Sequence, residues 1–149
     1  MEPFEPAAVD LRDYVDFDLA AATGRRVFAT DVVAVDVVCL EPGQEIAART
    51  LEGTDAIYTV LGGRAWVVTD EAEVTLEPLQ AVIVPAGVPH GMRNDSADPL
   101  IVQVVASPPD ELPDFVVGPA QAAEQDDVGR LESGRRPGWR DRLRRTLGG

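Results

Sequence analysis

Hydrophobic and polar residues alternate in short runs through the middle of the chain, from residue 27 to residue 107. Four segments are rich in Val, Ile and Thr, which favour strands: VFATDVVAVDVVCL (27–40), IYTVLGGRAWVVTD (57–70), EVTLEPLQAVIVPAG (73–87) and PLIVQVVASP (99–108). Turn-forming pairs such as Pro42-Gly43, Gly62-Gly63 and Asp98-Pro99 divide these runs. Many short strands at this spacing predict an all-β protein, either an antiparallel sandwich or a closed barrel.

The two ends of the chain have a different character. The segment before residue 27 is compatible with one short helix or with an edge strand, and its pattern does not decide between them. After Ser107 the chain is rich in Pro, Gly and charged residues, and we expect Phe115, Val116 and Val117 to anchor it on the barrel. The pattern predicts three parts: an N-terminal extension (1–26), a β-barrel (27–119) and a basic, flexible C-terminal tail (120–149).

The C-terminal tail concentrates the positive charge of an acidic protein. The whole chain carries a formal charge of −13, all its basic residues are Arg, and seven of them lie between Arg130 and Arg145. A body this acidic repels nucleic acid and anionic membrane, so we expect neither as a partner. Trp139, Leu143 and Leu147 follow at i, i+4 and i+8, which on a helix makes one apolar stripe that could bind a partner.

Length and composition limit the class of protein further. A chain of 149 residues with 45% hydrophobic residues suits one globular domain. No apolar run approaches the ~18 residues that a spanning helix needs, and the start of the chain is acidic, unlike a signal peptide. We therefore expect a cytoplasmic protein. Cys39, the single cysteine, lies in an apolar run and is expected to be a buried structural thiol.

Two stretches resemble the motifs of the cupin family, small double-stranded β-helix barrels. The second cupin motif has the form G-x5-P-x-G-x2-H-x3-N, and LQAVIVPAGVPHGMRN matches it at Pro85, Gly87, His90 and Asn94, with Leu79 in place of the leading glycine. The first motif has the form G-x5-H-x-H-x3,4-E-x6-G, and its frame is kept only at its terminal glycines, Gly43 and Gly63. The resemblance implies a cupin barrel, and it also implies a homodimer formed through strands of the outer sheet.

The resemblance further implies where a metal would bind. In metal-dependent cupins, two His and one Glu of the first motif join the His of the second motif, and these places fall here on Arg49, Leu51, Ala56 and His90. Arg repels a dication, and Leu and Ala have no donor atom, so we expect no metal and no other cofactor. A site rebuilt from the carboxylates of Asp55, Glu52 or Glu45 stays open as an alternative.

Strand alternation predicts which side chains line the interior. If His90 faces inward, Met92 does too, while Gln103 is a lone polar residue whose face the pattern leaves ambiguous. The first motif adds an inward row: Arg49, Leu51, Ala56, Tyr58 and Val60. The result is a mostly apolar interior with Arg49, Tyr58, His90 and Gln103 as candidate ligand-binding groups.

Each polar candidate also has a structural interpretation. His90 could form hydrogen bonds only within the barrel, and Tyr58 could simply fill it. A guanidinium that faces a dry interior needs a partner, so Arg49 either pairs with Asp55, Glu52 or Glu45, or it binds an anion.

Three functions remain open from the sequence. The first is metal-independent binding of a small organic anion in the barrel, for sensing, storage or delivery. The second is a metal-independent isomerase, lyase or cyclase in which His90, with Tyr58, serves as the acid or base. The third is an interaction protein that acts through its C-terminal tail.

Overall fold

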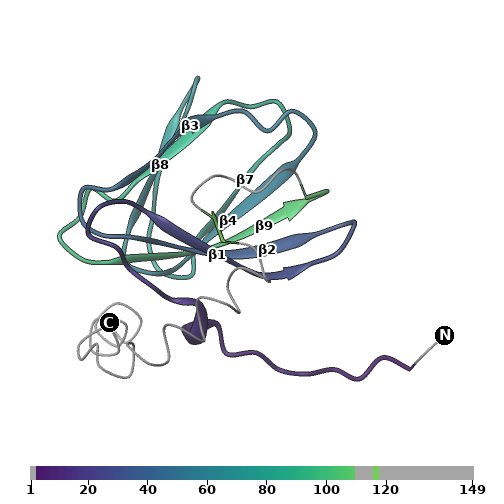
Figure 1. The fold of residues 1–149 in the computed structure, drawn as a ribbon. Coiled ribbons are helices and arrows are strands. Elements are labelled where there is room, and N and C mark those ends of the chain that lie inside the picture. The colour runs from purple at the N-terminus through teal and green to yellow at the C-terminus, as the bar shows by residue number, and fades with distance from the viewer. Residues whose placement is uncertain (1–2, 110–115, 118–149) are drawn as a thin grey trace.

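The computed structural model describes residues 3–109 and 116–117, and in these residues the strands form two sheets that face each other (Figure 1). The larger sheet has the order β10 (Val116–Val117), β1 (Thr23–Ala29), β2 (Ala34–Leu40), β9 (Leu100–Ser107), β4 (Asp55–Gly62), β7 (Ala81–Val84). The smaller sheet has the order β3 (Glu45–Arg49), β8 (His90–Arg93), β5 (Ala65–Thr69), β6 (Glu73–Leu76). Apart from the parallel pair β1–β10, all neighbours are antiparallel. The all-β, double-stranded β-helix prediction is confirmed.

The predicted turns fall where the strands end. The pair Gly62-Gly63 lies between β4 and β5, and Gly63 has a φ of +87°. A Cβ atom at this position would lie 2.3 Å from the carbonyl oxygen of Pro99, so both the conformation and the space require glycine. The frame of the first motif therefore ends at a backbone contact with the residue before β9, not at a functional side chain.

The glycine missing from the second motif has a structural counterpart at Leu79. This residue has a φ of 69°, in the left-handed region that glycine adopts without strain. Its amide donates to the carbonyl of Val60, and its side chain is 82% exposed. The turn before β7 thus keeps the backbone that the motif's glycine provides, although the residue is leucine.

The N-terminal segment crosses the outer face of the larger sheet. It contains one turn of 3-10 helix, η1 (Leu11–Tyr14), with the side chain of Asp10 accepting from the amide of Arg12. β1 then begins at Thr23, so the first strand starts four residues before residue 27, within the segment predicted as the extension. In the described part of the chain, no helix is long and apolar enough to cross a membrane.

The C-terminal side of the predicted barrel is described only in part. β10 pairs with β1 at Gly24↔Val116, and Val116 is buried, which agrees with its expected anchoring role. Phe115 and the predicted tail, with its Trp139 stripe, lie outside the described residues.

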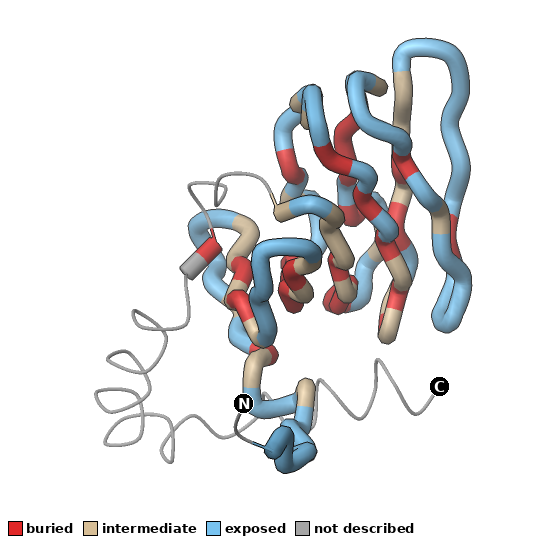
Figure 2. Tube along the Cα trace, turned by 90° about the vertical axis from the view of Figure 1, so that its right-hand side faces the viewer, coloured by how far each residue is buried: buried red, intermediate tan, exposed pale blue. Residues whose placement is uncertain are grey.

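Two apolar clusters lie on the two faces of the larger sheet. Figure 2 shows that buried residues alternate with more exposed ones along the strands, as expected of sheets with one face turned to a core. The main core lies between the sheets and includes Tyr58, Val60 and Met92, as the alternation predicted, with Leu51 packed against it. The second cluster joins Val15 of the N-terminal segment to Cys39 on the outer face. Burial raises the pKa of Cys39 to about 12, so the thiol stays protonated and unreactive, as expected of a structural cysteine.

Candidate functional site

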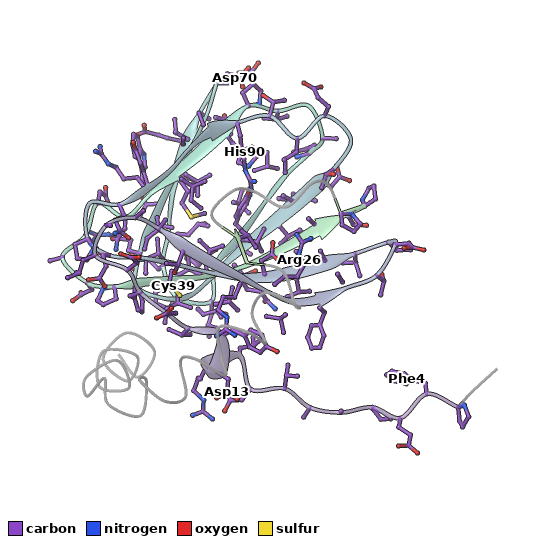
Figure 3. All side chains as sticks on the ribbon, viewed as in Figure 1. Phe4, Asp13, Arg26, Cys39, Asp70 and His90 are labelled. Atoms are coloured by element: carbon purple, nitrogen blue, oxygen red, sulfur yellow. The ribbon has the colours of Figure 1, made fainter. Side chains whose placement is uncertain are left out.

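Three of the four candidate polar residues meet between the sheets. Arg49 ends β3, and its Cα pairs with that of His90 at the start of β8, after a register shift that follows Ile46. Tyr58 projects from β4 of the opposite sheet, and its ring lies edge-on to the His90 ring with centroids 5.3 Å apart. Figure 3 shows His90 on the smaller sheet, on the side that faces the larger one. The fold thus gathers Arg49, Tyr58 and His90 from three strands.

Hydrogen bonds connect these side chains in a fixed direction. The Nδ1 atom of His90 lies 3.0 Å from the carbonyl oxygen of Val88, which can only accept, so Nδ1 carries a proton. In the neutral ring Nε2 is then an acceptor, and it receives the hydroxyl proton of Tyr58 across 2.6 Å. The Tyr58 oxygen in turn accepts from Nη2 of Arg49 at 3.3 Å. The chain of donors runs from Arg49 through Tyr58 to His90.

The surroundings of His90 favour this neutral ring. Burial lowers the pKa of His90 from its ordinary value of 6.5, and the positive charge of Arg49 lowers it further, while the bond to the Val88 carbonyl opposes both. His90 is therefore a neutral acceptor at neutral pH. A negative charge placed beside Arg49 would offset its positive charge and so weaken one of the two causes that lower the pKa of His90.

Arg49 carries the charge for which the site shows no counterion. The side chain is half-buried, and its Nε atom is buried without a hydrogen-bond partner. Within residues 3–109 and 116–117, no carboxylate forms an ion pair with it. The predicted partners lie elsewhere: Asp55 accepts from the amide of Ala86, Glu45 lies 4.0 Å from Arg93, and Glu52 is exposed. The interpretation that Arg49 pairs with a nearby carboxylate is therefore not supported by the described residues.

The side chains at the four metal-ligand places do not fit a transition metal. Arg49 has no lone pair to donate, Leu51 and Ala56 are apolar, and both ring nitrogens of His90 are already engaged. Asp55, Glu52 and Glu45 do not rebuild the site, because the described residues contain no cluster of three or more His, Cys, Asp or Glu side chains that could hold a metal ion. The donor set thus favours an anion over a cation.

Gln103 does not join the site. Its neighbours Val102 and Val104 belong to the core between the sheets, whereas Ile101, with the same alternation as Gln103, packs on the outer face. Successive side chains point to opposite faces of a strand, so Gln103, whose face the sequence left ambiguous, faces outward and away from the other three candidates. The apolar residues on both sides of Gln103 hid the phase in the sequence.

The sequence reasoning also missed an interior ion pair. Arg26 on β1 and Asp36 on β2 are cross-strand partners, and both are buried. Nε of Arg26 lies 2.8 Å from Oδ1 of Asp36, and Nη2 lies 3.2 Å from Oδ2. Asp36 interrupts the apolar run VVAVDVVCL at an inward position, and that single charge was the available signal.

Comparisons with known proteins agree with this architecture. Residues 36–106 match the Cupin domain family. The TT1209 protein of Thermus thermophilus is 35% identical, with a TM-score of 0.65, over 68% of this chain and 96% of that one. An RmlC-like cupin protein from Desulfovibrio desulfuricans is 21% identical, with a TM-score of 0.64, over 71% of this chain and all of that one, and it supports the fold alone. The chain belongs to the cupin superfamily.

A third structure carries the same description of the fold. The protein from Klebsiella pneumoniae subsp. pneumoniae, described as uncharacterized and conserved with a double-stranded β-helix domain, is 26% identical, with a TM-score of 0.65, over 70% of this chain and 91% of that one. No curated protein matches the sequence. The comparisons therefore establish a cupin domain protein, and its specific ligand has to be argued from its own residues.

The single histidine makes its protonation state directly measurable. We predict that an NMR titration of His90 gives a pKa below 6.5 and that nitrogen shifts identify the neutral form protonated at Nδ1. Arg49→Gln should raise this pKa, because it removes a nearby positive charge, yet leave it below 6.5 because burial is the larger cause. Replacing the exposed Arg64 by Gln is the matched control and should leave it unchanged. A pKa at or above 6.5 in the unmodified protein would contradict the assigned geometry.

Proposed function

We propose that this cupin binds a small organic anion at Arg49 without a metal ion, for sensing, storage or delivery. The observation that carries the proposal is the half-buried guanidinium with no carboxylate partner among the described residues and a buried Nε donor that makes no hydrogen bond. A charge that is partly removed from water and has no counterion is unfavourable, so an anion that supplies a counterion gains binding free energy.

Arg49 is the principal contact in this proposal, and Tyr58 and His90 complete the site around it. The Tyr58 proton is directed at His90, so Tyr58 does not offer it to a ligand in the resting site. The free N–H groups of Arg49 are then the donors for a carboxylate, and a planar fork of such donors suits two carboxylate oxygens. The hydrogen bond from Arg49 to Tyr58 holds that fork in place.

Replacing Arg49 by Leu should separate binding from stability. A charge-assisted hydrogen bond contributes about 1.5–3 kcal/mol, so Arg49→Leu should weaken carboxylate binding by roughly 10- to 150-fold. The free energy of unfolding should stay the same or rise, because a half-buried charge without a counterion is removed. Binding is measured by titrating short carboxylates while following the His90 NMR signal, and stability is measured by urea unfolding. Arg64→Leu is the control. Strong destabilisation by Arg49→Leu without ligand would mean that Arg49 is a structural residue.

A second candidate function is acid–base catalysis, which the 2.6 Å contact between Tyr58 and His90 favours. The Tyr58 oxygen could accept a proton from a carbon next to a substrate carbonyl while its own proton moves to Nε2 of neutral His90. Arg49 would stabilise the resulting enolate or a neighbouring carboxylate. Such a step belongs to an isomerase, lyase or cyclase.

Proton exchange tests this second function without knowledge of the substrate. If it is correct, the protein should catalyse exchange of the C3 protons of 2-oxobutyrate in deuterated water. Tyr58→Phe and His90→Gln should each slow the reaction by about 10²- to 10⁴-fold, the usual contribution of a general base. The rate should fall as the pH drops through the lowered pKa of His90, since the protonated ring cannot accept. Exchange that survives in Tyr58→Phe would exclude this mechanism.

We also propose that the functional unit is a homodimer formed through the outer face of the larger sheet. An apolar row crosses five strands there in register, and the row comprises Phe28, Val35, Val105, Ile57 and Ile83. The side chains of Phe28, Ile57 and Ile83 are 47%, 38% and 56% exposed. The N-terminal segment covers only the neighbouring cluster around Cys39.

The row suits a second copy of the same chain. Five strands span about 20 Å, and a standard interface buries roughly 800 Å² on each partner, so the row would form the apolar centre of such an interface. A twofold axis brings the row against itself, so one apolar patch serves both partners.

Charge placed in this row should separate the two copies. Light scattering should give twice the 16.0 kDa of one chain for the unmodified protein, whereas Ile57→Glu with Ile83→Glu should give a single chain, because four like charges would meet across the axis. Val74→Glu changes an exposed valine of the smaller sheet and should leave the dimer intact. A monomer in all three proteins would contradict the proposed interface.

A further inference from the structure

A second polar group faces the interior, apart from Arg49, Tyr58 and His90. The side chains of Arg26 and Asp36 form a two-point ion pair and are only 9% and 7% exposed. The two Nη1 donors of Arg26 form no hydrogen bond with the described residues, and each Asp36 oxygen keeps a lone pair beyond those that Arg26 uses. The pair is neutral as a whole but retains both donors and acceptors.

The ion pair lies on the same face of the larger sheet as Tyr58. Asp36 pairs with Val104, and Val104 pairs with Tyr58, so the three residues form one row across β2, β9 and β4. Val104 and Tyr58 both belong to the core between the sheets, which places the row on the inner face. Two strand spacings separate Asp36 from Tyr58, or about 10 Å between their backbones. Figure 3 shows Arg26 on the larger sheet and His90 on the smaller one, both between the two layers.

The charge of Arg49 and that of the Arg26–Asp36 pair favour different chemical groups on a ligand. Arg49 lacks a carboxylate partner among the described residues and attracts one negative charge. Arg26 and Asp36 compensate each other, so a second negative charge beside them would gain nothing from the pair as a whole and would meet the Asp36 carboxylate. A neutral group that both donates and accepts, such as a hydroxyl, can bond to both members. The apolar side chain of Val104 lies between the two polar groups.

We propose that the Arg26–Asp36 pair is the second recognition point of the anion site and selects a monoanion with a hydroxyl at its far end. The ligand class is a hydroxy monocarboxylate with a short apolar body, carboxylate at Arg49 and hydroxyl at the ion pair. This inference rests on the proposed anion binding at Arg49. It adds that the site prefers a ligand with one negative charge and one hydroxyl group.

The test compares three carboxylate series of equal lengths on the complete protein. The probes are 4-hydroxybutyrate, 5-hydroxypentanoate and 6-hydroxyhexanoate, their unsubstituted alkyl acids, and the diacids succinate, glutarate and adipate. Calorimetry and the His90 NMR signal give the dissociation constants. The best hydroxy acid should bind at least about tenfold more tightly than its alkyl acid and its diacid, since it gains hydrogen bonds to charged groups.

Variants of the ion pair then identify the source of that preference. Arg26→Met with Asp36→Leu removes both charges while keeping bulk, and it should abolish the preference for the hydroxy acid. Arg93→Met with Glu45→Leu removes an exposed pair outside this row and should preserve it. Asp36→Asn alone leaves Arg26 without its counterion, so this variant should bind the diacid more tightly than the hydroxy acid.

The outcomes distinguish this inference from the function on which it rests. Carboxylates that bind through Arg49 with equal affinity in all three series would overturn the hydroxyl preference and leave the anion site intact. A preference that persists in both Asp36 variants would overturn the role of the pair. If no probe binds the unmodified protein, both the anion site and this inference fail. A reversal of preference in Asp36→Asn supports the inference even if the double variant fails to fold.

Discussion

The hydrogen bond between Tyr58 and His90 joins the two sheets at the site, and the chemistry of the site depends on it. The two residues come from β4 and β8, which belong to different sheets, and their 2.6 Å contact bridges the two layers. The Val88 carbonyl fixes its direction, because it forces the His90 proton onto Nδ1. Neutral His90 then accepts a hydrogen bond from the Tyr58 hydroxyl, which leaves Arg49 as the side chain with free donors. This one hydrogen bond thereby links the packing of the two sheets, the protonation state of His90 and the free donors of Arg49.

The family resemblance places metal-binding side chains at these positions of the barrel. In this chain Arg49 puts a positive charge at one of them. Arg49 stands where the family resemblance puts the first histidine, and it lies beside the histidine that remains. Its positive charge lowers the pKa of His90. The histidine that the resemblance places among the metal ligands is therefore also less readily protonated. The same barrel frame can therefore carry the opposite charge preference, because the strands and turns that hold these positions do not depend on what the side chains bind.

Much of this could be predicted from the sequence, and the failures have identifiable causes. Turn residues and alternation predicted the strands, and motif spacing predicted that Arg49, Tyr58 and His90 converge. The face of Gln103 could not be predicted because apolar residues cover both faces of β9, which removes the alternation that would reveal its phase. The Arg26–Asp36 pair was missed because pairing between β1 and β2 depends on a bulge after Arg26 that no local pattern encodes.

The central claim is that the charge of Arg49 controls both anion binding and the protonation of His90. The most direct measurement is the pKa of His90, followed by NMR, as 5-hydroxypentanoate is added. Binding at Arg49 neutralises a charge that lowers this pKa, so saturation should raise it, and by linkage the anion should bind more tightly as the pH falls. Arg49→Leu should remove the response. An anion that binds while the pKa of His90 stays constant or falls would contradict the account.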